Sequence, residues 1–529
     1  MKKGIFLFTL TALLAALILT AAGCTGKDSV TTIRVVIYDR GTDGGKTNPT
    51  SNKWTEWIAE KLLEDENIKI VFESVPRHQE AQAQINLMAA GNPPDICMTY
   101  DINNINSWAL QGGLYDVSPY IDTILKDLKA FYGEDPAIPG RDFILRNMNA
   151  QTGEVFSLPS KRVNTARLNT FIRKDWLDKL GLPVPKTTEE YFNALVAFKD
   201  RDPGNLRRRN PPVSPIPYSM TVDVRWGAGN ILESFIDPRV PAKDRWINTI
   251  VDRFFLIPGY KEGVRFMNRM YNTGLIDRDF PLHKDDLPMA NLIKSGVIGS
   301  FGHNWDQIFR ENEKLYTDLL KNVPDAEWVA VDCMTNIDGV IRKISYDPAG
   351  LNIFIPRSSK NSQAAMRYLN WLAKFENYNF IQIGYEGISH ELVDGVPKLT
   401  PSAPDGWIQN SSMNIDYTPI MNGLFLATQE ESVRALANAY PWPAERIMDA
   451  YNIAMNNARP NPVIITSTPL ETAGPYSETL VNKSQEFMIR AITAAPHEFD
   501  REWEAGVTDW LNTGARVIRE EREAKYIAP

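Results

Sequence analysis

The sequence predicts an α/β fold, because strand-like and helix-like segments alternate along its first third. Short apolar runs are typical of strands buried in a parallel sheet, and longer segments with apolar residues at helical spacing are typical of packed helices. Their alternation favours a mostly parallel sheet flanked by helices. The expected strands cover 33–39, 68–75 and 94–101, and the expected helices cover 53–66 and 78–91.

Later segments extend this pattern. A strand ending at Leu158 and Pro159 precedes a second strand at 167–177, and a helix begins near 185. The stretch at 200–245 is rich in proline, glycine and arginine, which predicts loops. The last hundred or so residues are expected to be mainly helical. With 529 residues the chain is long enough for two or three domains.

The first 24 residues have the composition of an export signal. Two lysines precede an apolar run, and small residues precede Cys24. The segment at 21–24 resembles the lipobox of bacterial lipoproteins, which implies cleavage before Cys24 and lipidation of its thiol. Lipid chains would anchor the protein to the outer side of the cell membrane without a spanning helix. No later stretch approaches the roughly 18 apolar residues of a transmembrane helix.

Composition excludes some partners. Hydrophobic residues make up 43% and charged residues 23%, as in ordinary soluble proteins. The net charge of −8 gives no reason to expect nucleic acid. Besides Cys24 the chain contains only Cys97 and Cys333, and the sequence leaves open whether these two pair. Cys97 lies in an apolar run and is expected to be buried in a strand.

The glycine-rich stretch at 41–47 superficially resembles a nucleotide-binding phosphate loop. That motif requires glycine where this chain has Arg40, and no helix is expected to begin at Thr47. A different kind of site is expected here. Ligands of parallel α/β sheets bind beyond the carboxyl ends of the strands. The residues that follow three successive expected strands are Asp39, Arg40, Arg77, Tyr100 and Asp101.

Four segments together resemble a known family. Residues 94–122 are similar to the sugar-contacting segment of maltose-binding-type solute receptors, and 172–191 and 358–387 resemble connecting segments of these receptors. Residues 292–308 (LIKSGVIGSFGHNWDQI) resemble the segment whose tryptophan stacks on sugar. The order of the four matches the large lipoprotein branch of extracellular solute-binding proteins, which serve carbohydrate ABC transporters.

The resemblance implies a two-lobed periplasmic-binding-protein-like fold of type II with a helical C-terminal region. Each lobe would be a mostly parallel sheet flanked by helices, and the ligand would bind between lobes that close by a hinge motion. Crossings are expected near 159–162, near 335–350 and after about 395. The implied division is a signal at 1–24, a linker at 25–32, lobe 1 at 33–160 and 341–395, and lobe 2 at 161–340 and 396–529.

Sugar recognition needs aromatic faces for the C–H faces of pyranose rings and polar groups for hydroxyls that leave water. The first candidate is Trp305, flanked by His303 and Asn304. Loop tryptophans and cationic residues near a crossing add to the strand-end candidates. The further candidates are Lys161, Arg162, Trp226 and Trp407. Trp57 and Trp371 lie on helical faces and are expected in the core.

Some relatives carry a calcium loop after the helix that begins near 185. The corresponding stretch here, 202–210, keeps Asp202, but the following ligand places read Gly204, Leu206 and Asn210. Three arginines occupy the loop, so no calcium is expected there. The sequence also lacks a G-x-S-x-G elbow and an H-E-x-x-H motif. No cofactor is therefore expected.

The resulting interpretation is a monomeric receptor, without enzymatic activity, that delivers a sugar or oligosaccharide to ABC permease subunits. Three alternatives stay open from sequence alone. A peptide receptor or a sensory receptor would share the fold. A secreted glycoside hydrolase could hide its paired carboxylates among 65 acidic residues.

Overall fold

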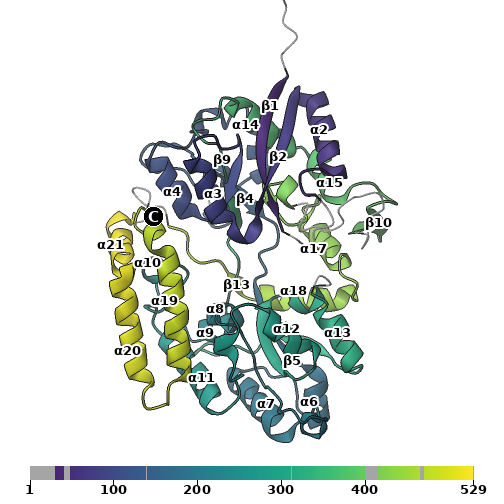
Figure 1. The fold of residues 1–529 in the computed structure, drawn as a ribbon, viewed down its shortest axis with the longest axis vertical. Helices are drawn as coiled ribbons and strands as arrows, with labels where there is room; N and C mark the ends of the chain where they lie inside the picture. Colours follow the sequence, from purple (N-terminus) through teal and green to yellow (C-terminus); the bar gives the residue numbers. More distant parts are fainter. Residues whose placement is uncertain are drawn as a thin grey trace, which may run out of the picture.

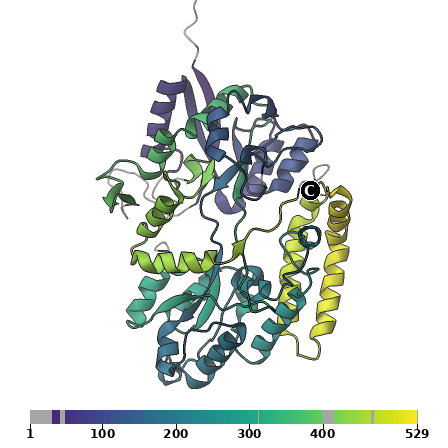
Figure 2. The same cartoon turned by 180° about the vertical axis from the view of Figure 1, so that it is seen from behind.

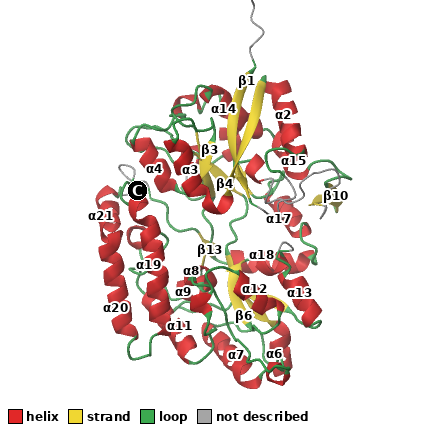
Figure 3. Ribbon diagram, viewed as in Figure 1, coloured by secondary structure: helices red, strands yellow, loops and turns green. Residues whose placement is uncertain are grey.

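The chain forms two α/β lobes, lobe 1 above lobe 2 in Figure 1. The structure is a computed structural model, and it describes residues 30–40, 48–138, 140–310, 313–399, 415–464 and 470–527. Both lobes combine helices and strands, and helices outnumber strands in lobe 2 (Figure 3). This confirms the α/β two-lobed architecture expected from the sequence.

The sheet of lobe 1 is assembled from segments that are far apart in the sequence. Four strands hydrogen-bond in the order β12-β4-β9-β3, and the parallel pair β1–β2 joins them through a bridge between Val35 and Ile96. The strands are β1 (Thr31–Asp39), β2 (Ile68–Pro76), β3 (Cys97–Thr99), β4 (Leu158–Arg162), β9 (Ala349–Phe354) and β12 (Met421–Asn422).

Helices cover this sheet, and the first of them begins where the sequence indicates. The Asn52 side chain caps the helix by accepting from the amides of Trp54 and Thr55. The helices are α2 (Lys53–Glu66), α3 (Glu80–Ala89), α4 (Ile102–Leu110), α5 (Lys126–Tyr132), α14 (Ser362–Leu372) and α15 (Phe375–Ile383). Trp371 of α14 is fully buried, as expected.

Lobe 2 is built around the sheet β6-β5-β7 and a two-stranded pair, β13–β8. The strands are β5 (Leu168–Arg173), β6 (Ser300–Asn304), β7 (Trp328–Val331), β8 (Lys343–Ile344) and β13 (Ala458–Arg459). The helices are α6 (Lys174–Leu180), α7 (Thr188–Arg201), α8 (Val224–Gly227), α9 (Gly229–Glu233), α10 (Ala242–Asn248), α11 (Tyr260–Asn272), α12 (Leu287–Lys294), α13 (Leu315–Asn322) and α18 (Ala444–Met455).

The expectation of mostly parallel sheets holds only in part. β1–β2 and β12–β4 are parallel, whereas β9 runs antiparallel to β3 and β4, and β5 runs antiparallel to β6 and β7. The reason lies in the crossings between lobes. β4 leads the chain out of lobe 1 and β9 brings it back, so these neighbours must run in opposite directions. Alternation along the sequence does not reveal such a reversal.

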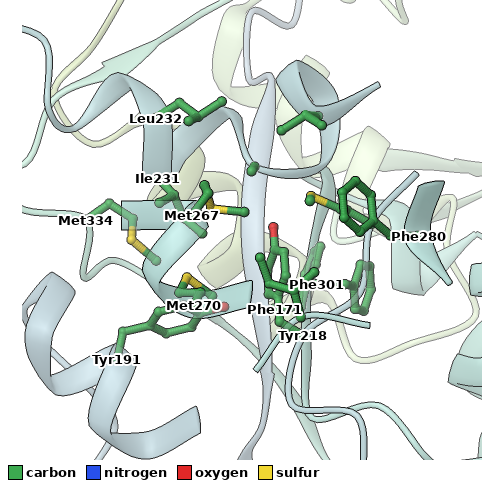
Figure 4. Close-up of a cluster of buried hydrophobic side chains, with 14 of the residues drawn as sticks. Phe171, Tyr191, Tyr218, Ile231, Leu232, Met267, Met270, Phe280, Phe301 and Met334 are labelled. Atoms are coloured by element: carbon green, nitrogen blue, oxygen red, sulfur yellow. The ribbon is translucent and has the colours of Figure 1, made fainter. Parts of the chain in front are cut away.

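Each lobe has its own hydrophobic core. The core of lobe 1 joins residues of β1, β2, β9 and α14. The core of lobe 2 packs Phe171 of β5 and Phe301 of β6 against Met267 and Met270 of α11 (Figure 4). Cys97 lies in the first core and Cys333 in the second, and both are buried free thiols. Burial raises the pKa of each thiol well above its usual range.

The chain returns to lobe 2 later than the sequence suggested. Tyr417, Ile420 and Met421 belong to the core of lobe 1, although 396–529 was expected in lobe 2. A small third cluster joins Ile383 and Leu426 to α17 (Gln429–Asn438) and to β11 (Val396–Leu399), which pairs with β10 (His390–Val393). The chain reaches the core of lobe 2 again at Ala437, near the end of α17, and Ile447 and Ala450 of α18 lie within that core.

The C-terminal helices lie along the side of lobe 2 and end beside lobe 1 (Figure 2). They are α19 (Ala473–Thr493), α20 (Phe499–Trp510) and α21 (Arg516–Lys525). At the start of α19, a Cβ added to Gly474 would lie 3.5 Å from the Cβ of Asn103 in α4. This makes a contact between the lobes away from the crossing strands. Within the described residues, none of the helices is both long enough and apolar enough to span a bilayer.

A truncation in the core of lobe 1 tests this packing. Leu369 of α14 is fully buried, so Leu369→Ala should lower the free energy of unfolding of this lobe by about 2–5 kcal/mol. The matched control is Leu110→Ala in the same lobe, where the side chain is 51% exposed and the loss should stay below about 1 kcal/mol. Urea unfolding followed by circular dichroism measures both. Equal losses would contradict the assigned core.

Candidate functional site

At the edge of lobe 1, an arginine is stacked on two tyrosines. The rings of Tyr38 and Tyr100 stack with centroids 6.3 Å apart. The Arg77 guanidinium carbon lies 4.2 Å from the Tyr100 centroid and 5.6 Å from that of Tyr38. The Tyr38 hydroxyl is fixed because it donates to the Met98 carbonyl at 2.7 Å. Strand ends therefore position a flat aromatic and guanidinium surface, as the sequence suggested for this edge.

This surface continues into the crossing strands. The Asn422 side-chain amide donates to the Tyr100 hydroxyl at 3.3 Å. Asn422 is paired in register with Arg162, which ends β4. The Arg162 guanidinium carbon lies 4.5 Å above the Tyr346 ring, and its Nε donates to the Asp347 carbonyl at 3.1 Å. A second arginine–tyrosine stack thus lies where the chain passes between the lobes.

Lobe 2 adds a tryptophan to the same run of contacts. The Trp226 and Tyr346 rings lie 6.3 Å apart, centroid to centroid, and the His303 ring meets Trp226 edge-on at 6.2 Å. The Tyr346 hydroxyl donates to Asn304 Oδ1 at 3.2 Å. The guanidinium carbon of Arg167 lies 5.6 Å from the centroid of the Trp226 ring. Trp226 and Tyr346 remain half-buried, so part of each ring faces solvent.

We call this run the interlobe ladder. It passes from lobe 1 through the crossing strands to lobe 2, and all of its side chains are half-buried. Aromatic faces can stack on apolar ring faces, and guanidinium and amide groups can donate to hydroxyl or carboxylate oxygens. Its members are Arg77, Tyr100, Asn422, Arg162, Tyr346 and Trp226.

A buried ion pair fixes the middle of the ladder. Arg146, whose side chain is 5% exposed, donates from Nη1 to both Asp135 oxygens at 2.7 and 2.8 Å. From Nη2 it donates to both Asp347 oxygens at 2.7 Å. Asp347 Oδ1 also accepts from the Ala349 amide. The segment that carries Tyr346 is thereby held to lobe 1 by bidentate, charge-assisted bonds.

Close backbone packing fixes the lobe 2 end of the ladder. Gly302 of β6 lies so near α8 that an added Cβ would come within 1.9 Å of the Gly227 carbonyl oxygen. The same oxygen accepts from the Tyr218 hydroxyl at 2.6 Å. These contacts hold α8, and with it Trp226, beside His303.

Several candidates from the sequence have structural roles. Arg40 forms a bidentate ion pair with the buried Asp416, at 2.7 and 2.9 Å. Burial raises the pKa of Asp416, and Arg40 opposes that shift. Asp101 caps α4 by accepting from the Asn103 amide at 2.9 Å. Lys161 points into lobe 1, where it donates to two backbone carbonyls, and burial lowers its pKa.

Trp305, the first candidate for stacking, lies elsewhere than expected. Its side chain is 5% exposed and packs edge-on against Tyr451 within the core of lobe 2. The neighbouring His303 is also buried, with Nε2 3.3 Å from Asp286, and it lowers the pKa of that carboxyl. Of this trio, Asn304 joins the ladder through Tyr346.

Two more candidates complete the set. Asp39 ends β1 and is exposed. Trp407 lies outside the described residues. Sequence reasoning missed Tyr346, Asn422 and the clamp formed by Arg146. Tyr346 falls within the crossing expected near 335–350, so its place beside a predicted hinge could have indicated it.

The stretch at 202–210, which corresponds to the calcium loop of some relatives, is held by hydrogen bonds within the protein. The Asp202 carboxylate accepts from the amides of Leu206 and Arg207, each at 2.9 Å. The Arg207 side chain donates to the last carbonyls of α7, and Arg209 Nη1 donates to the Ser295 carbonyl at 2.9 Å. Backbone and arginine groups thus occupy the loop. Across the described residues, three or more His, Cys, Asp or Glu side chains nowhere gather as a metal site would require.

Comparison with known proteins supports the class of solute-binding proteins. A sequence profile of the bacterial extracellular solute-binding proteins matches residues 46–214. The chain is 25% identical to lipoprotein LipO of Bacillus subtilis over 59% of each chain. It is 28% identical to the fructooligosaccharide ABC transporter substrate-binding protein FusA of Streptococcus pneumoniae over 36% of each. It therefore covers less than two thirds of these relatives' length. These matches support the family of extracellular solute-binding proteins.

The fold also matches solved structures. The alginate-binding protein AlgQ2 superimposes with a TM-score of 0.62 at 16% identity, over 94% of this chain and 98% of that chain. The superposition therefore supports the two-lobed fold over nearly the whole chain. Members of the family are binding proteins, and their location is extracellular.

A substitution at Gly302 tests how Trp226 is positioned. Gly302→Ala should lower the free energy of unfolding by about 1–3 kcal/mol, because the new Cβ displaces α8 from β6. Gly474→Ala is the control, since its Cβ meets only ordinary contacts at the start of α19. Chemical denaturation measures both. A fully stable Gly302→Ala protein would contradict the close approach.

Proposed function

We propose that this protein is an extracytoplasmic receptor that binds an oligosaccharide between its lobes and delivers it to an ABC permease. The observation that carries the proposal is the interlobe ladder, in which half-buried aromatic and polar groups from both lobes form one run. A ligand in contact with this run would touch lobe 1, the crossing strands and lobe 2. Binding would thereby favour the closed arrangement of the lobes.

The chemistry of the ladder suits a sugar. Tyr100, Tyr346 and Trp226 offer ring faces, and the Asn422 amide and two guanidiniums offer donors beside them. Pyranose rings present an apolar C–H face and an equatorial belt of hydroxyls, which need both kinds of partner. The names of FusA and AlgQ2, which state fructooligosaccharide transport and alginate binding, support the same ligand class.

A peptide receptor and a sensory receptor remain the competing functions. Both would use two lobes, but a peptide needs partners for its backbone amides and carbonyls. The described ladder offers more donors than acceptors, which favours hydroxyl-rich or anionic ligands over peptides. Delivery to a permease and action as a monomer belong to this proposal. The absence of catalysis is also part of it.

A binding experiment tests the proposal. Trp226→Ala should weaken oligosaccharide binding at least about tenfold while leaving the fold intact, because the ring is half-buried and its loss removes a stacking face. The control is Trp246→Ala, which removes a half-buried tryptophan near the C-terminal helices. Isothermal titration with neutral oligosaccharides, uronic acid oligosaccharides and peptides measures the effect. Recovery of uncleaved sugar checks that no hydrolysis occurs. Binding of peptides alone would overturn the proposed ligand class.

The lipid anchor has a separate test. Cys24 follows the export signal, so Cys24→Ala should release the protein from the membrane fraction of the producing cells. The expected outcome is a shift of most of the protein to the soluble extracytoplasmic fraction, seen by immunoblot. Cys97→Ala is the matched control, because its thiol is buried in lobe 1. Unchanged membrane retention of Cys24→Ala would contradict anchoring.

A further inference from the structure

The guanidinium group of Arg77 forms no ion pair with a carboxylate of the described residues. Its guanidinium is half-buried and stacks on Tyr100, yet it makes neither a hydrogen bond nor an ion pair with any described residue. Stacking occupies the face of the group and leaves the N–H donors at its edge unused. A partly desolvated guanidinium whose donors have no acceptor is unfavourable, and a ligand that supplies acceptors relieves this cost.

Arg162 repeats this arrangement on the crossing strand. It stacks on Tyr346, and only its Nε donates within the described residues, to the Asp347 carbonyl. Its two terminal nitrogens have no acceptor there. Neither Arg162 nor Arg77 has a carboxylate within ion-pair distance in the described part of the chain.

Other arginines at this junction are neutralised, and Arg146 is one of them, through Asp135 and Asp347. Arg40 is paired with Asp416 at 2.7 Å, and Arg167 with Glu233 at 3.0 Å. Both ion pairs are largely buried and stabilise the fold. Within the described residues, each arginine that holds the fold here has a carboxylate in an ion pair, and the two in the ladder have none.

The carboxylates nearest the ladder already have partners. Glu80 lies 3.1 Å from the Tyr100 amide and 3.3 Å from the Tyr38 hydroxyl, both of which donate to it. Asp347 accepts from Arg146, and Asp101 accepts from Asn103. Asp347 attracts Arg162, and Asp416 attracts Arg77, through charge at longer range, but none of these carboxylates forms an ion pair with either guanidinium in the described part of the chain.

We infer that the natural ligand is an acidic oligosaccharide, whose uronic acid carboxylates bind Arg77 and Arg162. This rests on the proposed carbohydrate-binding function and deepens it. A guanidinium edge matches a carboxylate with two parallel N–H···O bonds, whereas a sugar hydroxyl offers a single oxygen. The tyrosine ring stacked against each arginine fixes the plane of the guanidinium group. The same ring offers a face for the sugar next to that group.

The order of groups along the ladder suits a ligand of more than one sugar unit. Tyr100 and Asn422 separate the two arginines, and each contacts the next member of the run. Each arginine stands beside an aromatic ring, so charge and stacking alternate from lobe 1 to the crossing strand. An oligosaccharide with carboxylates on successive or alternate units presents the matching alternation.

The test compares acidic oligosaccharides with neutral forms of the same chains. The probes are galacturonate oligosaccharides and mannuronate–guluronate oligosaccharides, each beside the product of reducing its carboxyls to hydroxymethyl groups. Isothermal titration of the wild type should give at least about tenfold tighter binding of one acidic series than of its reduced form. Binding of the acidic series should also weaken between about 50 and about 500 mM salt, while binding of the neutral form should not.

The variants assign the effect to the two arginines. Arg77→Gln and Arg162→Gln should each reduce acidic binding about tenfold or more and reduce neutral binding by a clearly smaller factor, because a hydroxyl loses one donor whereas a carboxylate loses its counter-charge as well. Arg77→Lys should recover only part of the loss, because an ammonium lacks the planar fork. The matched control is Arg278→Gln, since Arg278 stacks on Tyr271 at 4.3 Å in lobe 2 without belonging to the ladder.

The outcomes separate this inference from the proposed function. Tight binding of neutral oligosaccharides, with no preference for the acidic forms, overturns the inference and leaves the carbohydrate receptor standing. Failure of every oligosaccharide, acidic or neutral, overturns the proposed function. Acidic preference that survives both Gln substitutions overturns the assignment to Arg77 and Arg162. If either variant folds poorly, the salt dependence of the wild type still decides whether charge is recognised.

Discussion

The junction between the lobes depends on one buried arginine. Arg146 donates in bidentate fashion to Asp135 and Asp347, and so ties the segment returning from lobe 2 to the interior of lobe 1. Removing Arg146 would leave the buried Asp135 carboxylate and the carboxylate of Asp347 without their shared cation, which is strongly unfavourable. Asp347 in turn orders Ala349 at the start of β9, and its carbonyl accepts from Arg162. The centre of the candidate site is therefore an extension of this clamp.

From that centre, the two ends of the ladder are held by different means. In lobe 1, strand ends carry Tyr100 and Arg77, and the buried hydroxyl of Tyr38 fixes the ring beside them. In lobe 2, close contact between the backbones at Gly302 and Gly227 places Trp226. Since the lobes are joined mainly through crossing segments, a relative motion of the lobes would change the distance between these ends. A ligand that contacts both ends would stabilise one separation.

Local patterns account for what could be predicted. The capped start of α2, the burial of Cys97 in β3 and the burial of Trp371 follow from residues close in sequence. The position of Arg77 and Tyr100 at strand ends follows equally from local signals. Trp305 shows the limit, because a tryptophan in a recognisable segment can face a core or a ligand. Its burial against Tyr451, over a hundred residues later in the sequence, was not deducible from its neighbours.

The sequence by itself determined the α/β lobes, the resemblance to solute-binding proteins and the strand-end edge on which part of the site lies, because periodicity and motif order are properties of neighbouring residues. Only the tertiary structure decided strand direction and the state of each arginine. Arg40 is neutralised by Asp416, 376 positions away, while Arg77 and Arg162 stack on tyrosines and keep unused donors. Which charge is paired depends on segments that meet only after the chain has crossed between the lobes.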